Sequence, residues 1–340
     1  MKVERTAKTP DLDHLVEELR PKLDDLEQDR QSMRRSALRW FTLLGTVTLV
    51  AAIAAAVAMA TAAGANAAGI GVFPLVGGVV WIVISGSRYQ RRWKKWVTDA
   101  LMPEICQALD GDIEYRAEAN HSFVKPFNAL ELIGRWNRGE VQHLVRGEYG
   151  GRRFEMVHAA LRARSSGKDS SDTQVFDGFL FRIQVHTHFD PGLSIRPNFG
   201  WFSKAFGKRA IPTGNQEFDS VFLVSTDDGS DLDAEQLSRA LTPDWQDALL
   251  ALHEELGTLP YGQPRLRAGF KYDTCYLALT LEEEGCSLGP IRTQRPRPFP
   301  QVGHVLANES RLERDLRKMV ADVDTFRRVI DQFKSADASH

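Results

Sequence analysis

The chain has 340 residues, with 43 lysines and arginines against 45 aspartates and glutamates, a formal net charge of −2 and three cysteines. This length accommodates about one to three domains, and the charge balance excludes a strongly basic nucleic-acid binder and an acidic disordered chain. Three cysteines are too few for a disulfide scaffold. The charges are unevenly distributed, because the 48 residues from Trp40 to Ser87 contain no Asp, Glu, Lys or Arg.

Residues 1–39 are predicted to form a cytoplasmic amphipathic helix of the coiled-coil type. The apolar positions alternate in spacings of four and three residues, which is typical of a helix-pairing seam, and they are Leu12, Val16, Leu19, Leu23 and Leu26. Pro21 removes an amide donor and crowds the carbonyl group of Glu17. We therefore expect a kink or a break near Pro21.

The charge-free segment 40–87 is predicted to be a transmembrane helical hairpin. One spanning helix needs about 20 apolar residues, so this segment is long enough for two spans and a turn. We expect the first span from Trp40 to about Ala63, a turn over residues 64–69, and the second span from about Ile70 to Ser87. The alternatives are a buried hairpin of a soluble protein and a cleaved signal peptide, but a signal peptide is not typically preceded by 39 residues rich in charge.

Basic residues flank this segment on both sides, and the positive-inside rule therefore places both termini in the cytoplasm, with only a small turn on the other side of the membrane. Arg34, Arg35 and Arg39 precede the first span. The residues after the second span are predicted to anchor the chain to anionic lipid headgroups, and they are Arg88, Arg91, Arg92, Trp93, Lys94, Lys95 and Trp96. Their composition would also suit nucleic acid, but their position beside a span favours the membrane.

A juxtamembrane helical region is predicted over residues 88–145. The second span is expected to continue as a helix through Leu101. Pro103 is expected to kink this helix or to start a new one that ends at Gly111, and a short helix is expected over residues 129–136. In the cytoplasm, the three cysteines, Cys106, Cys275 and Cys286, would be reduced thiols.

Residues 146–289 are predicted to form a cytoplasmic α+β domain with a curved, mostly antiparallel sheet and one main packed helix. The expected strands cover residues 152–164, 175–188, 193–196 and 220–226, and residues 266–281 form one strand or a hairpin about Tyr272 and Asp273. The main helix is expected to be capped by Thr242, to start at Pro243 and to end at Gly257. Its buried stripe would be Trp245, Ala248, Leu249, Leu252 and Leu256.

A proline-rich linker over residues 290–305 is followed by a predicted amphipathic helix over residues 306–340. Its apolar positions repeat the spacing of the N-terminal seam and are Leu312, Leu316, Met319, Val323, Phe326, Ile330 and Phe333. Each seam can pack on the folded domain, or the two seams can pair with each other or with a second subunit. The pattern leaves these alternatives open.

Several short motifs in this domain resemble the bacterial domain-of-unknown-function family three-one-three-seven. They are Gly147-Glu148-Tyr149-Gly150-Gly151, Phe154-Glu155, the run from Val175 to Phe181, the stretch from Phe218 to Val224, and Leu241-Thr242-Pro243. The resemblance covers roughly residues 90–285. It implies a bacterial inner-membrane protein with spans ahead of a cytoplasmic α+β domain, and it implies no activity and no catalytic residues.

The strongest candidate for a catalytic site is a metal site at His186, His188 and Asp190. Alternation along the predicted strand puts both imidazoles on one face, a spacing that metal-dependent hydrolases use. The site would need a further ligand from elsewhere in the chain, for which His158, His253 and Asp228 are candidates that no pattern singles out. The polar neighbours Arg182 and Gln184 favour the simpler interpretation that the histidines lie on a solvated surface. The cysteines lack a Cys–His–Asn pattern and are expected to be buried or free thiols.

These patterns favour a non-enzymatic, membrane-anchored binding or assembly module, with no cofactor and no nucleic acid. Its partner would be an unidentified protein or a second copy of the chain, in addition to the lipid bilayer. The first alternative is a membrane-tethered, metal-dependent hydrolase that uses His186, His188 and Asp190. The second alternative is a sheet domain that binds a ligand or a lipid.

Overall fold

The computed structural model describes residues 12–63, 72–109, 112–164, 172–198, 210–230, 232, 234–257, 265–280, 302, 304–307 and 311–337. The chain divides into two compact units. Unit 1 comprises residues 1–104 and 300–320, and unit 2 comprises residues 105–299 and 321–340. The predicted loop over residues 165–171 and most of the proline-rich linker lie outside the described residues.

Unit 1 is built from helices. They are α1 (Leu12–Glu18), α2 (Arg20–Ala63), α3 (Val72–Leu109) as far as Glu104, and the first part of α9 (Leu312–Asp337). The break between α1 and α2 falls at Leu19, as Pro21 predicts, because proline is best tolerated in the first turn of a helix, where its missing amide costs no hydrogen bond. After this break α2 continues for 44 residues, so the amphipathic N-terminal segment and the apolar segment form one helix.

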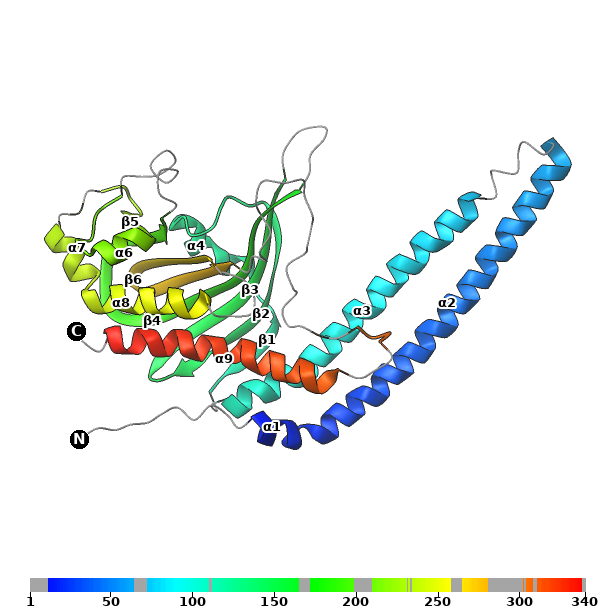
Figure 1. Ribbon diagram of the computed structural model, residues 1–340, viewed down its shortest axis with the longest axis horizontal. Helices are drawn as coiled ribbons and strands as arrows, with labels where there is room; N and C mark the ends of the chain where they lie inside the picture. The colour runs from blue at the N-terminus through cyan, green and yellow to red at the C-terminus, as the bar shows by residue number, and fades with distance from the viewer. Residues whose placement is uncertain are drawn as a thin grey trace. The chain divides into compact units, whose positions relative to one another are not determined.

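The helices α2 and α3 lie side by side and run in opposite directions (Figure 1). The ring centroids of Phe41 and Tyr89 are 6.1 Å apart, and the Lys22 ammonium lies 2.6 Å from a carboxylate oxygen of Glu104. Of the two alternatives at Pro103, a new helix does not start there, because α3 runs through Pro103 as one helix and ends at Leu109. The contacts of α2 with α3 therefore extend over a long stretch of both helices.

Unit 2 contains a six-stranded antiparallel sheet with the strand order β1-β2-β3-β4-β5, in which β6 also pairs with β4. The strands are β1 (Glu114–Glu118), β2 (Arg138–Tyr149), β3 (Arg152–Arg164), β4 (Asp172–Pro197), β5 (Phe222–Thr226) and β6 (Arg265–Thr280). Short helices occur at α6 (Gln216–Val221) and α7 (Ala234–Ala240). The predicted α+β class with a mostly antiparallel sheet is confirmed.

One face of the sheet packs against α8 (Pro243–Gly257) and against the part of α9 that belongs to unit 2 (Figure 1). Trp245 of α8 is fully buried and contacts Phe270 of β6 and Phe333 of α9, with ring centroids 5.0 and 5.4 Å away. All five residues of the predicted α8 stripe are buried. At the start of α8 the Thr242 carbonyl accepts a hydrogen bond from Gln246, but the Thr242 hydroxyl has no hydrogen bond with any described residue.

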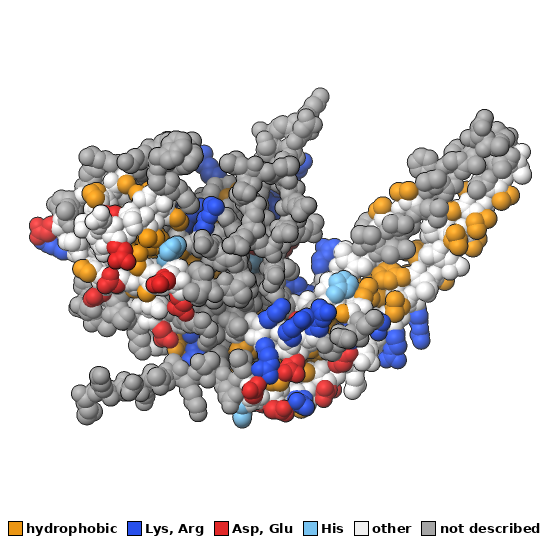
Figure 2. All heavy atoms as spheres, viewed as in Figure 1, with side chains coloured by type: hydrophobic (Ala, Val, Ile, Leu, Met, Phe, Trp, Pro, Cys, Tyr) orange, Lys and Arg blue, Asp and Glu red, His pale blue; other side chains and the backbone are white. Residues whose placement is uncertain are grey.

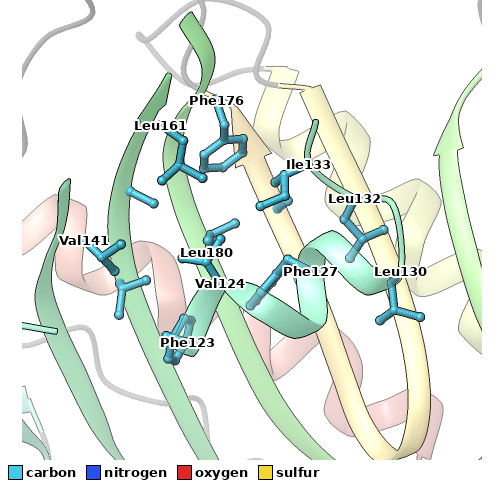
Figure 3. Close-up of a cluster of buried hydrophobic side chains, with 13 residues drawn as sticks. Phe123, Val124, Phe127, Leu130, Leu132, Ile133, Val141, Leu161, Phe176 and Leu180 are labelled. Atoms are coloured by element: carbon cyan, nitrogen blue, oxygen red, sulfur yellow. The ribbon is translucent and has the colours of Figure 1, made fainter. Parts of the chain in front are cut away.

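The opposite face is covered over part of its area by η2 (His121–Val124) and α4 (Lys125–Ala129). Phe123, Val124 and Phe127 from these helices form a buried cluster with Leu161 of β3 and Leu180 of β4 (Figure 3). The prediction of a helix over residues 129–136 is wrong, because α4 ends at Ala129 and the turn that follows inserts Leu130, Leu132 and Ile133 into the same cluster.

Other differences from the sequence prediction concern strand length. The stretch over residues 88–145 is helical only in parts and contributes β1 and most of β2. The two strands predicted over residues 175–188 and 193–196 form the single strand β4, and residues 265–280 form one strand rather than a hairpin. Tyr272 has a positive φ of 54° and lies where the pairing between β4 and β6 shifts register, so the strand bends there without turning back.

Candidate functional sites: an apolar helix surface and a charged groove

Among the described residues, one helix segment, within α2, is long and apolar enough to cross a membrane. Six large aliphatic side chains in the apolar half of α2 point outward and are 53–60% exposed, namely Leu43, Val47, Leu49, Val50, Ile53 and Val57, whereas Leu44 is partly buried. The orange side chains along the two long helices in Figure 2 show part of this surface. Soluble monomers rarely expose a continuous apolar surface of this kind.

The inward side of the same helix segment carries mostly small residues. Ala52 is only 6% exposed, and Gly45 and Thr48 are partly buried. Helix pairs in lipid place small residues at their interface, so that the backbones approach closely, and leave the larger aliphatic residues to the acyl chains. The apolar half of α2 therefore has the residue distribution of a helix that is surrounded by lipid.

Cations gather where the apolar parts of α2 and α3 end. Arg88, Arg91, Arg92 and Lys95 are exposed on α3, Lys94 is partly buried, and Trp96 is 41% exposed. Trp93 is an exception, because its side chain is buried within unit 1 (1% exposed) and does not point outward as an interface anchor would. Arg39 is the last charged residue of α2 before its apolar part. Because Phe41 contacts Tyr89, Arg39 and Arg88 lie at about the same height along the helix pair.

The charged part of α2, which precedes its apolar part, contains one buried arginine, Arg30. Arg30 interrupts the N-terminal seam, and its guanidinium group forms an ion pair with Glu27 at 2.7 Å and donates hydrogen bonds to the carbonyl oxygens of Ala307 at 2.5 Å and Val305 at 3.4 Å. The amide of Val305 in turn donates to the side chain of Gln90 at 2.9 Å. This role of Arg30 in holding residues 305–307 is not predicted from the sequence, because its partners are about 275 residues away along the chain.

The described residues of both predicted seams are buried. In unit 1 they are Val16, Leu19, Leu23, Leu26, Leu312, Leu316 and Met319, and in unit 2 they are Val323, Ile330 and Phe333. The side chains of Leu12 and Phe326 lie outside the described residues. Within unit 1 an ion pair at 2.8 Å joins Arg317 of α9 to Asp13 of α1.

The predicted metal-binding residues do not converge. His186, His188 and Asp190 are all exposed on β4, and the His188 ring lies 5.9 Å from that of Tyr272. Across the described ranges of the chain, no group of three or more His, Cys, Asp and Glu side chains is arranged to hold a metal ion.

The suggested third ligands have other surroundings. His158 lies 3.2 Å from a carboxylate oxygen of Asp177, and Asp228 accepts a hydrogen bond from the amide of Ser230 at 2.8 Å. The ring of His253 on α8 lies 5.5 Å from Phe222, and burial lowers the pKa of His253.

The cysteines that the structure describes, Cys106 and Cys275, are buried and form no disulfide with each other. Burial raises the pKa of the Cys106 thiol to about 12, which keeps it protonated near neutral pH and makes it a poor nucleophile. Cys286 lies outside the described residues.

A groove of about 580 Å³ lies on the part of the sheet that η2 and α4 leave uncovered. Five of its residues lie opposite one another on neighbouring strands, namely Glu114 on β1, Arg146 on β2, Glu155 on β3, Arg182 on β4 and Tyr276 on β6. A second row contains Glu148 opposite Arg153, and Gln184 opposite Thr274. We call this surface the charged groove.

Several groups on the floor of the charged groove are held in place. Arg146 forms an ion pair with Glu114 at 2.7 Å, and hydrogen bonds from Arg116 and Arg146 lower the pKa of the Glu114 carboxyl. The guanidinium of Arg182 lies 4.1 Å from the centre of the Phe123 ring and donates to the Phe123 carbonyl oxygen at 2.7 Å. Such groups can recognise a polar partner by ion pairs and hydrogen bonds with little loss of side-chain entropy.

Only part of the charged groove is predictable from the sequence. The alternation along β4 predicts that Arg182 and Gln184 lie on one solvated face, because alternating polar residues indicate a half-buried strand. The residues of the other strands join them only through cross-strand register, which requires partners far apart in the sequence. The polar alternation of Arg146 with Glu148 and of Arg153 with Glu155 was the signal that could have been used.

No protein-family model matches the chain, and no curated protein matches it. Among solved structures, the chain is similar to the crystal structure of the mycobacterial trehalose monomycolate transport factor A, with 9% sequence identity and a TM-score of 0.32. The match covers 66% of this chain and 86% of that chain. A likeness of this size carries no argument about function, and the resemblance to family three-one-three-seven stays a prediction.

Proposed function

We propose that the protein is a non-enzymatic binding or assembly module anchored in the bacterial inner membrane. The outward-facing aliphatic residues of α2, opposite an inward side of small residues, carry this proposal. In water, this exposed surface would be a strong liability for aggregation, whereas in lipid it is the favourable arrangement.

The position of α3 supports a transmembrane hairpin with both termini in the cytoplasm. The two helices are antiparallel, and the basic residues that flank their apolar parts lie near the same level, since Phe41 contacts Tyr89. Val76, Val80 and Trp81 of α3 are also exposed. Arg88, Arg91, Arg92 and Lys95 can then contact anionic headgroups on the cytoplasmic side, each contributing about 1 kcal/mol.

The two seams would pair within one chain. The buried seam residues of α1, α2 and α9 in unit 1, together with the ion pair between Arg317 and Asp13, support this pairing over pairing between subunits.

The charged groove favours the second candidate function, which is ligand binding by the sheet, and the two functions are compatible. The metal-dependent hydrolase has no comparable support, because its proposed ligands are exposed and do not converge among the described residues.

Charged substitutions on the lipid-facing side of α2 test the proposal. We expect the full chain to remain in the membrane pellet after carbonate extraction, and Val50→Lys combined with Ile53→Lys to release much of it. Each lysine near the centre of a span costs about 2.5–3.5 kcal/mol of insertion free energy. The matched control is Ser32→Lys, an exposed position of the same helix in its charged part, which should stay in the pellet. Extraction of the unmodified chain, or equal behaviour of the double variant and the control, would contradict membrane anchoring.

A further inference from the structure

The charges that line the charged groove do not cancel. Five carboxylates and three guanidinium groups line it. Glu114 pairs with Arg146 at 2.7 Å and also with Arg116, which does not line the groove, and Glu155 pairs with Arg182 at 3.5 Å. The groups that form no ion pair with any described residue are Asp112, Glu148, Asp273 and Arg153. The groove therefore offers three carboxylates and one cation to a partner.

These four groups have a definite order across the sheet. Asp112 and Glu148 lie at the β1–β2 end, where a Cβ atom at Gly147 would collide with the carbonyl oxygen of Asp112. Arg153 lies opposite Glu148 on β3, and Asp273 lies on β6. From β2 to β6 there are three steps between neighbouring strands, or about 14 Å in total. The order is negative, positive, negative.

We propose that the charged groove binds a basic, extended segment of a partner protein that lies across the strands. An extended chain rises about 3.3 Å per residue, and every second side chain points to the same side. Two basic residues four positions apart therefore span the distance between Glu148 and Asp273. An acidic residue between them lies within reach of the long Arg153 side chain, which is one strand from Glu148 and two strands from Asp273, so the segment has the charge order positive, negative, positive. This inference rests on the proposed function as a binding module and names the chemistry of its partner.

The structure of the groove floor suits such a partner. Arg182 is held by Phe123, and the Tyr276 ring packs edge-on against Phe127 with centroids 5.3 Å apart. The partner then orders few side chains of the protein when it binds, which reduces the entropic cost of the complex.

Binding of labelled peptides to the full chain in detergent micelles tests the proposal. The probe is a fluorescent peptide with the core Lys-Ser-Glu-Ser-Lys, and its charge-inverted counterpart is Glu-Ser-Lys-Ser-Glu. At low ionic strength we expect the first peptide to bind with a Kd at least about fivefold lower than the second, measured by fluorescence anisotropy. Equal affinities, or no saturable binding of either peptide up to about 1 mM, would overturn the proposal.

Substitutions in the groove locate the binding. Glu148→Gln combined with Asp273→Asn should raise the Kd of the first peptide about fivefold or more, and Arg153→Glu should shift the preference to Lys-Ser-Lys-Ser-Lys. Asp244→Asn, an exposed carboxylate on α8 outside the groove, is the matched control and should leave the Kd unchanged. Unchanged binding by the groove variants would place any binding elsewhere and reject the groove. Because all measurements use micelles, failure here is independent of the result of carbonate extraction.

Discussion

The helix α8 and the apolar half of α2 both carry many large apolar side chains, yet they place them in opposite ways. In α8 the large residues Trp245, Leu249 and Leu252 are buried against the sheet and α9, while Asp244 and Asp247 face water. In the apolar half of α2 the large aliphatic residues face outward and Ala52 is buried. The comparison shows that the same physical preference, removal of apolar surface from water, selects different sides of a helix when the surroundings differ.

The largest expected effect in this comparison is the removal of the central side chain of α8. Trp245→Ala should lower the free energy of unfolding of the sheet by about 3–5 kcal/mol, because it leaves a cavity between Phe270 and Phe333. Urea unfolding followed by circular dichroism in micelles measures this loss. A loss below about 1 kcal/mol would mean that the α8 stripe is not part of a close-packed core.

The buried arginine of α2 should have the next largest effect. Arg30→Ala leaves Glu27 and the carbonyl groups of Val305 and Ala307 without their donor, and it should cost about 2–3 kcal/mol. We expect faster proteolytic cleavage around residues 302–311, detected by mass spectrometry of the fragments. Arg35→Ala, an exposed arginine on the same helix, is the control. Equal cleavage of the two variants would contradict a role of Arg30 in holding this segment.

A truncation on the outward side of α2 should have little effect. Val50→Ala should change the free energy of unfolding by no more than about 0.5 kcal/mol, because Val50 is 60% exposed and has little protein packed around it. The same urea experiment as for Trp245→Ala measures it. If Val50→Ala lowers the free energy of unfolding as much as Trp245→Ala does, the outward side of α2 is packed against protein. The proposed difference between α2 and α8 would then be rejected.

The smallest expected effect concerns pH. Burial lowers the pKa of His253 on α8, so the folded chain binds this proton less readily than the unfolded chain. The free energy of unfolding is therefore greatest above the unfolded pKa of about 6.5, and it decreases as the pH falls below that value towards the folded pKa. His253→Gln should make this decrease shallower in urea titrations between about pH 7 and pH 5. If the free energy of unfolding of the unmodified chain and of His253→Gln falls equally steeply with pH, His253 does not contribute to this pH dependence.

Local patterns were sufficient to predict several elements of the fold. The bounds of β3 agree with the strand predicted over residues 152–164, and α8 runs from Pro243 to Gly257 as predicted. Both depend on interactions between residues close in the sequence, namely alternation in a strand and the i, i+3 and i+4 spacing of a helix. The helix expected over residues 129–136 failed because Leu130, Leu132 and Ile133 gain more by entering a tertiary cluster than by continuing α4.

The candidate sites divide in the same way. The apolar segment of α2 and its basic flanks can be predicted from the amino-acid sequence, because a long absence of charge and the residues around it are properties of consecutive positions. Three other features become visible only in the folded chain: Trp93 is buried, Arg30 holds residues 305–307, and Glu114, Arg146, Glu155 and Arg182 form one row. These facts depend on register and packing between distant segments, which no local pattern of residues encodes.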